Sequence, residues 1–583
     1  MSERTVTAIV VIALLLSSGA PLRVSGAAPI RLPDIEHPKV KTDGKIGRSG
    51  GTLIAGEISD PRTFNLIVSQ ETSSTIPLSR VFDGLVETNA DTLEIEPGLA
   101  ESWTASPDGK TWTFRLRRGV RFHDGVELTA DDVVFNMDTA FTPGVRGGRR
   151  DRMTLAGKPM RWRKIDPYTV EFRTEEPFGP FLRTMTFGIL PKHKLEAALA
   201  AGPAEFNKTW GVNTPPREIV GTGPFIMQTY VPGERIVFLR SPRYWKVDAV
   251  GNRLPYLARH IQVIVPNLDT LRLKFQAGET DIYGVRPREF AEFKAGEKSG
   301  KYTVYEAGPT ASTEFLMFNE NPKGIAPPKL AWFSNTKFRQ AVSYAIDRGA
   351  IANQVYGGRA SPLYGPITPA NKFFSNPHVK QYPHDLGRAE TVLAEAGFKK
   401  GPDGVLRDAS GSVVEFTLST NAENSERVAI ANLIRQDLTK LGIKVTLAPE
   451  AFNTLVGKLD ANGNVEALVW GFTAGVDPHT SQNIWKSSGS LHRWNPFQEK
   501  PATPWEAEID RLFDQAATTV DQNRRKQLYS RWQEVVAEQQ PLIYLVNALT
   551  SVAARNTLAN IRPSPFEGAT WNIEQIFYTV PFR

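Results

Sequence analysis

The chain has 583 residues, 41% hydrophobic and 22% charged, which is enough material for several domains and more than one hydrophobic core. Its net charge of +7 comes from 69 basic and 62 acidic residues. A nucleic-acid-binding protein would gather basic and aromatic residues along one stripe. The densest basic segment here is RGGRRDR at residues 146–152, which we expect to be a solvated loop, so no nucleic-acid partner is expected.

The first residues have the three parts of a secretory signal peptide. Arg4 precedes a short apolar run at residues 6–16, and small residues follow up to Ala28. Because the run is too short to span a bilayer as a stable helix, we expect a signal peptide over residues 1–27, cleaved after Ala27. An uncleaved anchor is the alternative. Residues 28–48 are polar and contain proline, and we expect them to form a tether.

The sequence contains no cysteine. A large core does not need disulfides, so this absence is compatible with export to an oxidising compartment. It also excludes a lipid-modified N-terminal cysteine as an anchor. No later apolar run approaches 18 residues, so we expect the mature chain to be soluble.

Residues 99–140 predict two strands followed by the start of a helix. Apolar and polar residues alternate over residues 111–117, which is typical of a strand with one buried face. Asp-Gly turns flank this strand. Thr129, followed three residues later by Asp132, predicts a helix N-cap with an acidic partner.

The rest of the chain mixes predicted strands and helices, which favours an α/β protein. Residues 414–447 predict a strand, a helix and a second strand, and a crossover of this length favours parallel pairing of the two strands. We expect strands at 50–58, 166–172, 261–265, 315–319, 414–418, 443–447 and 467–471, and helices at 76–85, 177–187, 267–275, 338–346, 427–441 and 524–538.

Residue types that carry catalysis or bind metals do not form a compact motif. There is no cysteine nucleophile, and no two histidines are four residues apart. The glycines at residues 221–223 are not followed by the Lys-Ser/Thr of a phosphate loop. We therefore expect no catalytic residue, metal or cofactor, although a Ser-His-Asp set assembled by folding stays open.

Residues 470–494 combine three tryptophans with small polar residues. Trp485 and Trp494 lie in irregular sequence and would be partly exposed unless they line a cavity. Clefts for organic ligands combine aromatic walls with a few placed polar groups. The segment is therefore a candidate ligand site, and aromatic residues packed beneath a domain are the alternative.

Three segments, in order, resemble the family 5 extracytoplasmic solute-binding proteins, the peptide- and oligopeptide-binding components of ABC importers. The resemblance extends over roughly residues 50–550. The matching residues are GLAESW at 98–103, DG at 108–109, WTFRLR at 112–117, GVRF at 119–122, DG at 124–125, LTADDV at 128–133, GTGPF at 221–225 and FRQAVSYAIDR at 338–348.

This resemblance implies an α/β fold with two lobes that close about a hinge, and a small extra domain inserted in the first lobe. It divides the chain into lobe 1 at 49–88, 220–308 and 536–583, the inserted domain at 89–219, and lobe 2 at 309–535. The 99–140 stretch then belongs to the inserted domain and its core.

The resemblance also suggests the ligand-binding residues. The loop after the first strand would bring Ser69, Gln70 and Glu71 to the cleft. In the family, an acid that receives the free amine of a peptide follows the strand end at Trp470. Thr473 stands in its place here, and Asp477 lies four residues later. The complete candidate set is Ser69, Gln70, Glu71, Trp470, Thr473, Asp477, Trp485 and Trp494.

The function implied is that of a periplasmic binding protein, acting as a monomer and without catalysis. It would capture a peptide or similar small organic solute and deliver it to the permease subunits of an ABC importer at the inner membrane. The alternatives are a secreted hydrolase of peptides or glycans, and a chaperone-like or scaffold protein.

Overall fold

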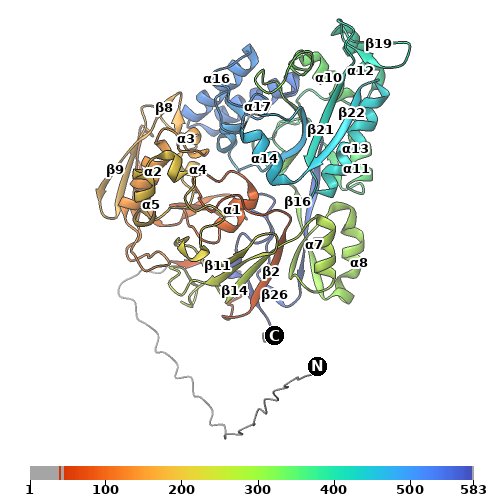
Figure 1. The fold of residues 1–583 in the computed structure, drawn as a ribbon. Coiled ribbons are helices and arrows are strands. Elements are labelled where there is room, and N and C mark those ends of the chain that lie inside the picture. The colour runs from red at the N-terminus through yellow and green to blue at the C-terminus, as the bar shows by residue number, and fades with distance from the viewer. Residues whose placement is uncertain (1–37, 41–44, 462, 581–583) are drawn as a thin grey trace, which may run out of the picture.

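The computed structural model describes residues 38–40, 45–461 and 463–580. It has two lobes, one above the other in Figure 1, with a smaller domain at the side of the lower lobe. The expected signal peptide lies outside the described residues. Among the helices that are described, none has the length and apolar character needed to cross a membrane.

The inserted domain is built on the strands predicted within residues 99–117. Its sheet is antiparallel, and Phe114 is buried on it, with its ring edge-on to that of Phe172 at a centroid distance of 5.7 Å. The strand order is β5 (Ala100–Ala105), β6 (Thr111–Leu116), β10 (Thr169–Arg173) and β9 (Arg161–Asp166).

Helix α2 (Ala130–Phe141) packs on this sheet and starts where the sequence predicts. The backbone N–H of Thr129 donates to Oδ2 of Asp132 at 2.9 Å, and the Thr129 hydroxyl accepts from the first turn. The predicted capping arrangement is confirmed, and it satisfies amide groups that a helix start leaves without partners.

Lobe 1 combines segments that are far apart in the sequence. Its first sheet has the order β11 (Phe225–Val231), β12 (Arg235–Arg240), β14 (Arg259–Ile264) and β2 (Thr52–Glu57). Its second sheet has β25 (Val546–Arg555) between β15 (Ile282–Val285) and β16 (Tyr302–Pro309). Helices α7 (Leu268–Gln276) and α8 (Phe290–Gly300) pack against this second sheet.

Lobe 2 contains a five-stranded sheet with helices around it (Figure 1). The predicted parallel pairing of the strands near 414 and 443 is confirmed, with Phe416 opposite Val445. The strand order is β22 (Lys444–Glu450), β21 (Glu415–Asn421), β23 (Ala467–Phe472), β17 (Thr313–Phe318) and β24 (Leu542–Tyr544).

Two hydrophobic cores stabilise lobe 2. Helices α10 (Thr336–Ala345) and α13 (Ser425–Lys440) contribute to one of them. Helices α16 (Pro504–Thr518) and α17 (Gln522–Gln539) contribute to the other, which holds most of the tryptophans of this lobe.

The chain crosses between the lobes at two adjacent places. Residues 310–312 connect β16 in lobe 1 to β17 in lobe 2, and Leu545 connects β24 to β25 on the way back. Because β24 pairs with β17, the return crossing lies about ten residues later than the expected boundary at 535/536. Paired crossings of this kind form the hinge of two-lobed proteins.

The segment before lobe 1 is attached to it rather than free. Strand β1 (Lys39–Val40) pairs in parallel with β13 (Val247–Asp248). The Lys45 carbonyl accepts from Asn560 Nδ2 at 3.3 Å. The described end of the expected tether therefore belongs to the fold.

Candidate ligand-binding site

A cavity lies where the two lobes meet beside the first crossing segment. Ala311 of that segment and Phe566 of lobe 1 line it on one side. The lobe 2 side consists of Pro366, Ile367, Thr368, Asn371, Ala474, Gly475, Pro478, Ser481 and Trp532. Its volume of about 20 Å³ is close to that of one water molecule. A solute larger than water does not fit into the cavity in this arrangement of the lobes.

The chain after β23 forms one wall of this cavity. Asn371 Nδ2 donates to the Val476 carbonyl at 2.8 Å and fixes the segment after it leaves the sheet. Ala474 and Gly475 line the cavity, whereas Thr473 is exposed and does not.

Asp477 lies next to the cavity but its carboxylate is engaged within lobe 2. Its two oxygens accept from Nη1 and Nη2 of Arg525 at 2.7 and 2.8 Å, and Oδ1 also accepts from the backbone N–H of His479 at 3.0 Å. Burial alone would raise the pKa of Asp477, but Arg525 outweighs it and holds the pKa below its usual value. The pairing with Arg525 keeps Asp477 ionised, and with an exposed fraction of 6% the pair is shielded from water.

The tryptophans of residues 470–494 are core residues. Trp470 stacks on Phe452 at 5.1 Å, and Trp485 and Trp494 are 4% and 0% exposed. The expectation of partial exposure for Trp485 and Trp494 is wrong, because helices later in the chain cover them. Trp532 of α17 lies 5.0 Å from the Trp485 ring, and it is this tryptophan that lines the cavity. No local pattern in the sequence marks Trp532.

The loop at residues 69–71 caps a helix and meets lobe 2 through one side chain. Glu71 is the N-cap residue of α1 (Thr72–Leu78), which lies earlier than the predicted helix at 76–85, and its carboxylate accepts from Ser74 Oγ at 3.0 Å. Ser69 hydrogen-bonds within its own loop. Gln70 Oε1 accepts from Ser490 Oγ of lobe 2 at 3.1 Å.

Residues 146–152 also belong to the boundary between the lobes, so the expectation of a solvated loop is wrong. They include helix α3 (Arg149–Arg152), where Arg149 is 8% exposed. The Asp151 carboxylate accepts from the backbone N–H of Ser490 at 3.1 Å. The Arg152 carbonyl bonds His479 Nε2 at 2.9 Å.

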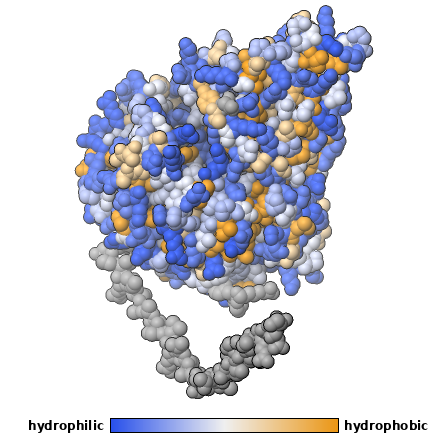
Figure 2. Space-filling view, in the orientation of Figure 1, coloured by the Kyte–Doolittle hydropathy of each residue, from blue (hydrophilic) through white to orange (hydrophobic). Residues whose placement is uncertain are grey.

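A second bridge joins the lobes through Asp460 of lobe 2. Its oxygens accept from Nη1 of Arg62 in lobe 1 and from Nη2 of Arg493 in lobe 2, both at 2.8 Å. In the space-filling view the lobes form one continuous surface, and hydrophilic residues prevail over the inserted domain (Figure 2). The structure is therefore a closed arrangement of the two lobes.

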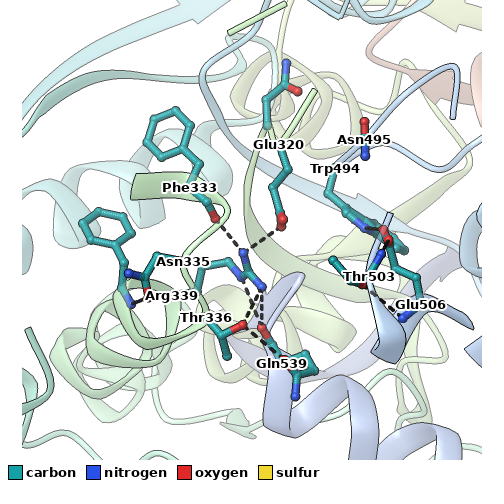
Figure 3. Close-up of polar contacts among 12 residues, drawn as sticks. Glu320, Phe333, Asn335, Thr336, Arg339, Trp494, Asn495, Thr503, Glu506 and Gln539 are labelled. Atoms are coloured by element: carbon teal, nitrogen blue, oxygen red, sulfur yellow. Dashed lines mark hydrogen bonds and ion pairs between the residues drawn. The ribbon is translucent and has the colours of Figure 1, made fainter. Parts of the chain in front are cut away.

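A buried polar cluster lies at the opposite end of β17 from the cavity. Glu320 and Arg339 form an ion pair with an Oε1–Nη1 distance of 3.0 Å, and Arg339 also donates to the carbonyls of Phe333 and Gln539 (Figure 3). Burial raises the pKa of Glu320 to about 7, although Arg339 opposes this shift. The cluster ties β17 to α10 and α17.

Among the described residues, no three His, Cys, Asp or Glu side chains are grouped as metal ligands would be.

Two lobes joined by paired crossings, with a cavity at their junction, define a two-lobed solute-binding protein. The family model of the bacterial extracellular solute-binding proteins, family 5 (middle region), matches residues 94–492. A probable ABC transporter-binding protein from Deinococcus radiodurans is 32% identical over 550 residues, covering 89% of this chain and 91% of the relative. The chain belongs to the family 5 solute-binding proteins, as the sequence predicts.

Solved structures agree with this assignment. The oligopeptide-binding protein AppA of Bacillus subtilis, in complex with a nonapeptide, has a TM-score of 0.80 at 27% identity, covering 92% of this chain and all of that one. The periplasmic binding protein MelB from Agrobacterium fabrum, in complex with stachyose, shares the fold with a TM-score of 0.82 at 23% identity, covering 94% and 89%. The family and the relatives are binding proteins rather than enzymes.

Proposed function

We propose that this chain is the solute-capturing component of an ABC importer and that a peptide or similar small organic solute binds between its lobes. The cavity at the junction of the lobes, beside a crossing segment, is the observation that carries the proposal. Relatives of this family are named for oligopeptides, dipeptides and haem, which supports an organic solute of moderate size.

Capture uses the hinge at the paired crossings. When the lobes separate, the cavity walls of Ala474 and Gly475 open toward water and admit the solute. When they close, water is excluded, which strengthens each polar contact to the solute because the local dielectric constant falls. The contacts of α3 and Asp460 across the boundary form in the same step and stabilise the closed arrangement.

The closed arrangement is what the membrane partner recognises in this proposal. Permease subunits would distinguish the closed from the open protein by shape, and ATP would be hydrolysed by other subunits. The binding protein makes and breaks no bond in this scheme. We further propose that it acts in the periplasm as a monomer, after removal of its signal peptide.

The hydrolase alternative receives no support from the relatives. In the structure, His123 and His479 are buried and bond backbone carbonyls, and burial lowers the pKa of each to about 4. Neutral, tightly packed imidazoles of this kind suit a structural role better than proton transfer at neutral pH.

The proposal is tested by what the protein binds. Native mass spectrometry of the purified mature chain should reveal a copurified small molecule, or a library of peptides and other solutes should raise its melting temperature. A bound solute at a hundredfold excess over Kd stabilises the folded state by about 2.7 kcal/mol. Turnover of a peptide or glycan, abolished by one Ser or Asp substitution, would contradict the proposal.

A further inference from the structure

The walls of the interlobe cavity carry no formal charge. All eleven residues that line it are neutral, and they include two aromatic side chains, Trp532 and Phe566. Three lining side chains, those of Thr368, Asn371 and Ser481, carry hydroxyl or amide groups, and the last two already donate to backbone carbonyls. A charged group enclosed here would lose its hydration and find no oppositely charged lining residue.

The ionisable groups next to the cavity interact with one another. Asp477, which precedes the lining residue Pro478, is fully engaged by Arg525. Glu567, which follows Phe566, has its pKa raised by burial, and Arg183 opposes that shift. The nearby guanidinium groups are those of Arg525, which Asp477 neutralises, and of Arg183, which interacts with Asp477 and Glu567. An ammonium group in the cavity would therefore find no carboxylate among the lining residues.

One hydrogen-bond donor at the cavity has no acceptor in the described part of the chain. Trp532 is 1% exposed, and its indole N–H is without a partner. A buried tryptophan N–H ordinarily has an acceptor, because leaving the group unpaired away from water is costly. Phe513 and Trp485 pack edge-on with the Trp532 ring at 5.2 and 5.0 Å and hold it in place.

We propose that the part of the solute held in this cavity is uncharged, presents a hydrogen-bond acceptor to the indole N–H of Trp532 and packs an apolar face near Phe566. This inference rests on the proposed function and specifies its substrate class. A peptide whose amino end is blocked and a neutral oligosaccharide share this chemistry. A peptide that places a free amino end in the cavity does not.

Matched probes test the inference without any substitution. Isothermal titration calorimetry on the mature chain would compare a short peptide with a free amino end, the same peptide after N-acetylation, and neutral oligosaccharides. We expect the acetylated peptide or an oligosaccharide to bind at least about tenfold more tightly than the free-amine peptide, which corresponds to about 1.4 kcal/mol. The neutral probe that binds more tightly shows whether the solute is a blocked peptide or an oligosaccharide.

A free-amine peptide that binds as tightly as its acetylated form, or more tightly, would overturn this inference and leave the proposed function intact. If no probe and no extract solute binds or raises the melting temperature, the proposed function and the inference both fail. These two outcomes are therefore distinguishable.

Two sets of variants place the effect at the cavity. Ala474→Asp adds a carboxylate to the lining and should shift preference toward the free-amine peptide by about tenfold relative to the neutral, similarly sized Ala474→Asn. Trp532→Phe keeps an aromatic ring but removes the donor, and should weaken the best neutral probe by about fivefold to tenfold. Trp103→Phe, in β5 of the inserted domain, is the control. Unchanged preference in Ala474→Asp would overturn the inference.

Discussion

Asp477 and Arg525 form a bidentate ion pair inside lobe 2, with oxygen–nitrogen distances of 2.7 and 2.8 Å. The two residues are 48 positions apart and connect the segment after β23 to the start of α17. Arg525 Nε also donates to the Ala516 carbonyl at 3.0 Å, so α16 takes part in the same network. The pair therefore fixes one wall of the cavity.

Removing one member of this pair should destabilise the protein strongly. Arg525→Met leaves a buried carboxylate without a partner, and we expect a loss of about 3 to 5 kcal/mol in the free energy of unfolding. The double variant with Asp477→Asn should lose less than the sum of the two single losses. Urea unfolding measures each value. Arg531→Ala, which breaks an exposed pair with Glu508, should cost less than about 1 kcal/mol. An equally small loss for Arg525→Met would contradict the role of the pair.

Truncation of the Trp485 side chain should lower the free energy of unfolding. Its ring packs against those of Trp494 and Trp532 in the core of lobe 2, so Trp485→Ala leaves a cavity and should cost about 3 to 5 kcal/mol. The measurement is chemical unfolding of the variant beside Trp103→Ala, whose side chain is only partly buried. A loss below about 1 kcal/mol would mean that the site relaxes around the missing ring.

The contacts of α3 with lobe 2 should bias the lobes toward closure. Asp151→Asn weakens the acceptor of the Ser490 backbone N–H, and Ser490→Ala removes the hydroxyl that donates to Gln70 across the same boundary. A hydrogen bond worth about 1 kcal/mol changes the open-to-closed ratio by about fivefold. Because the natural sequence has no cysteine, Glu196→Cys and Lys444→Cys provide two unique sites for spin labels, one in the inserted domain and one in lobe 2.

Pulsed electron resonance should then show a larger population of long distances between the labels in both variants. Asp166→Asn, an exposed change within the inserted domain, is the control. Identical distance distributions in the variants and the control would show that neither α3 nor Gln70 contributes to closure.

Four buried carboxyl groups should make the folded protein less stable as the pH rises. Burial raises the pKa of Glu57, Asp83, Glu320 and Glu426 to about 7 each. Because each pKa is higher in the folded than in the unfolded chain, the stabilisation is full below about pH 4 and is lost as the pH rises to about 7.

Glu320→Gln removes one of these groups and should flatten the dependence by about 1 to 3 kcal/mol between roughly pH 4 and pH 8. Denaturant unfolding of the variant and the parent at several pH values measures the difference. Glu415→Gln, which changes an exposed carboxyl on β21, should leave the pH dependence unchanged. Parallel curves for Glu320→Gln and the parent would contradict the expectation.

Local patterns predict much of the fold. The alternation at residues 111–117 identifies β6, the Thr129 and Asp132 pair identifies the start of α2, and the crossover length identifies the parallel pairing of β21 with β22. Each of these three predictions depends on residues that are close in the sequence or on the repeat of a single helix or strand. Local sequence is therefore enough to predict them.

The geometry of the candidate site depends on long-range contacts and could not be predicted in the same way. Phe566 and Trp532 reach the cavity from segments with no local signal of a ligand site, and Asp477 meets its partner only after α17 has packed. Residues 146–152 look like a solvated loop because of their charge, yet they contact lobe 2 more than 300 positions later. Tertiary packing determines the cavity lining, the partner of Asp477 and the position of residues 146–152.

The path of the chain through β25 imposes an order of assembly. The lobe 2 sheet uses only strands between Thr313 and Tyr544, so it can be completed from one uninterrupted stretch of chain. The second sheet of lobe 1 lacks its central strand until residues 546–555 have been synthesised. Lobe 1 begins earlier in the chain, but its folding must therefore be completed after that of lobe 2. A chain that stops before β25 would have a complete lobe 2 sheet and a second lobe 1 sheet without its central strand.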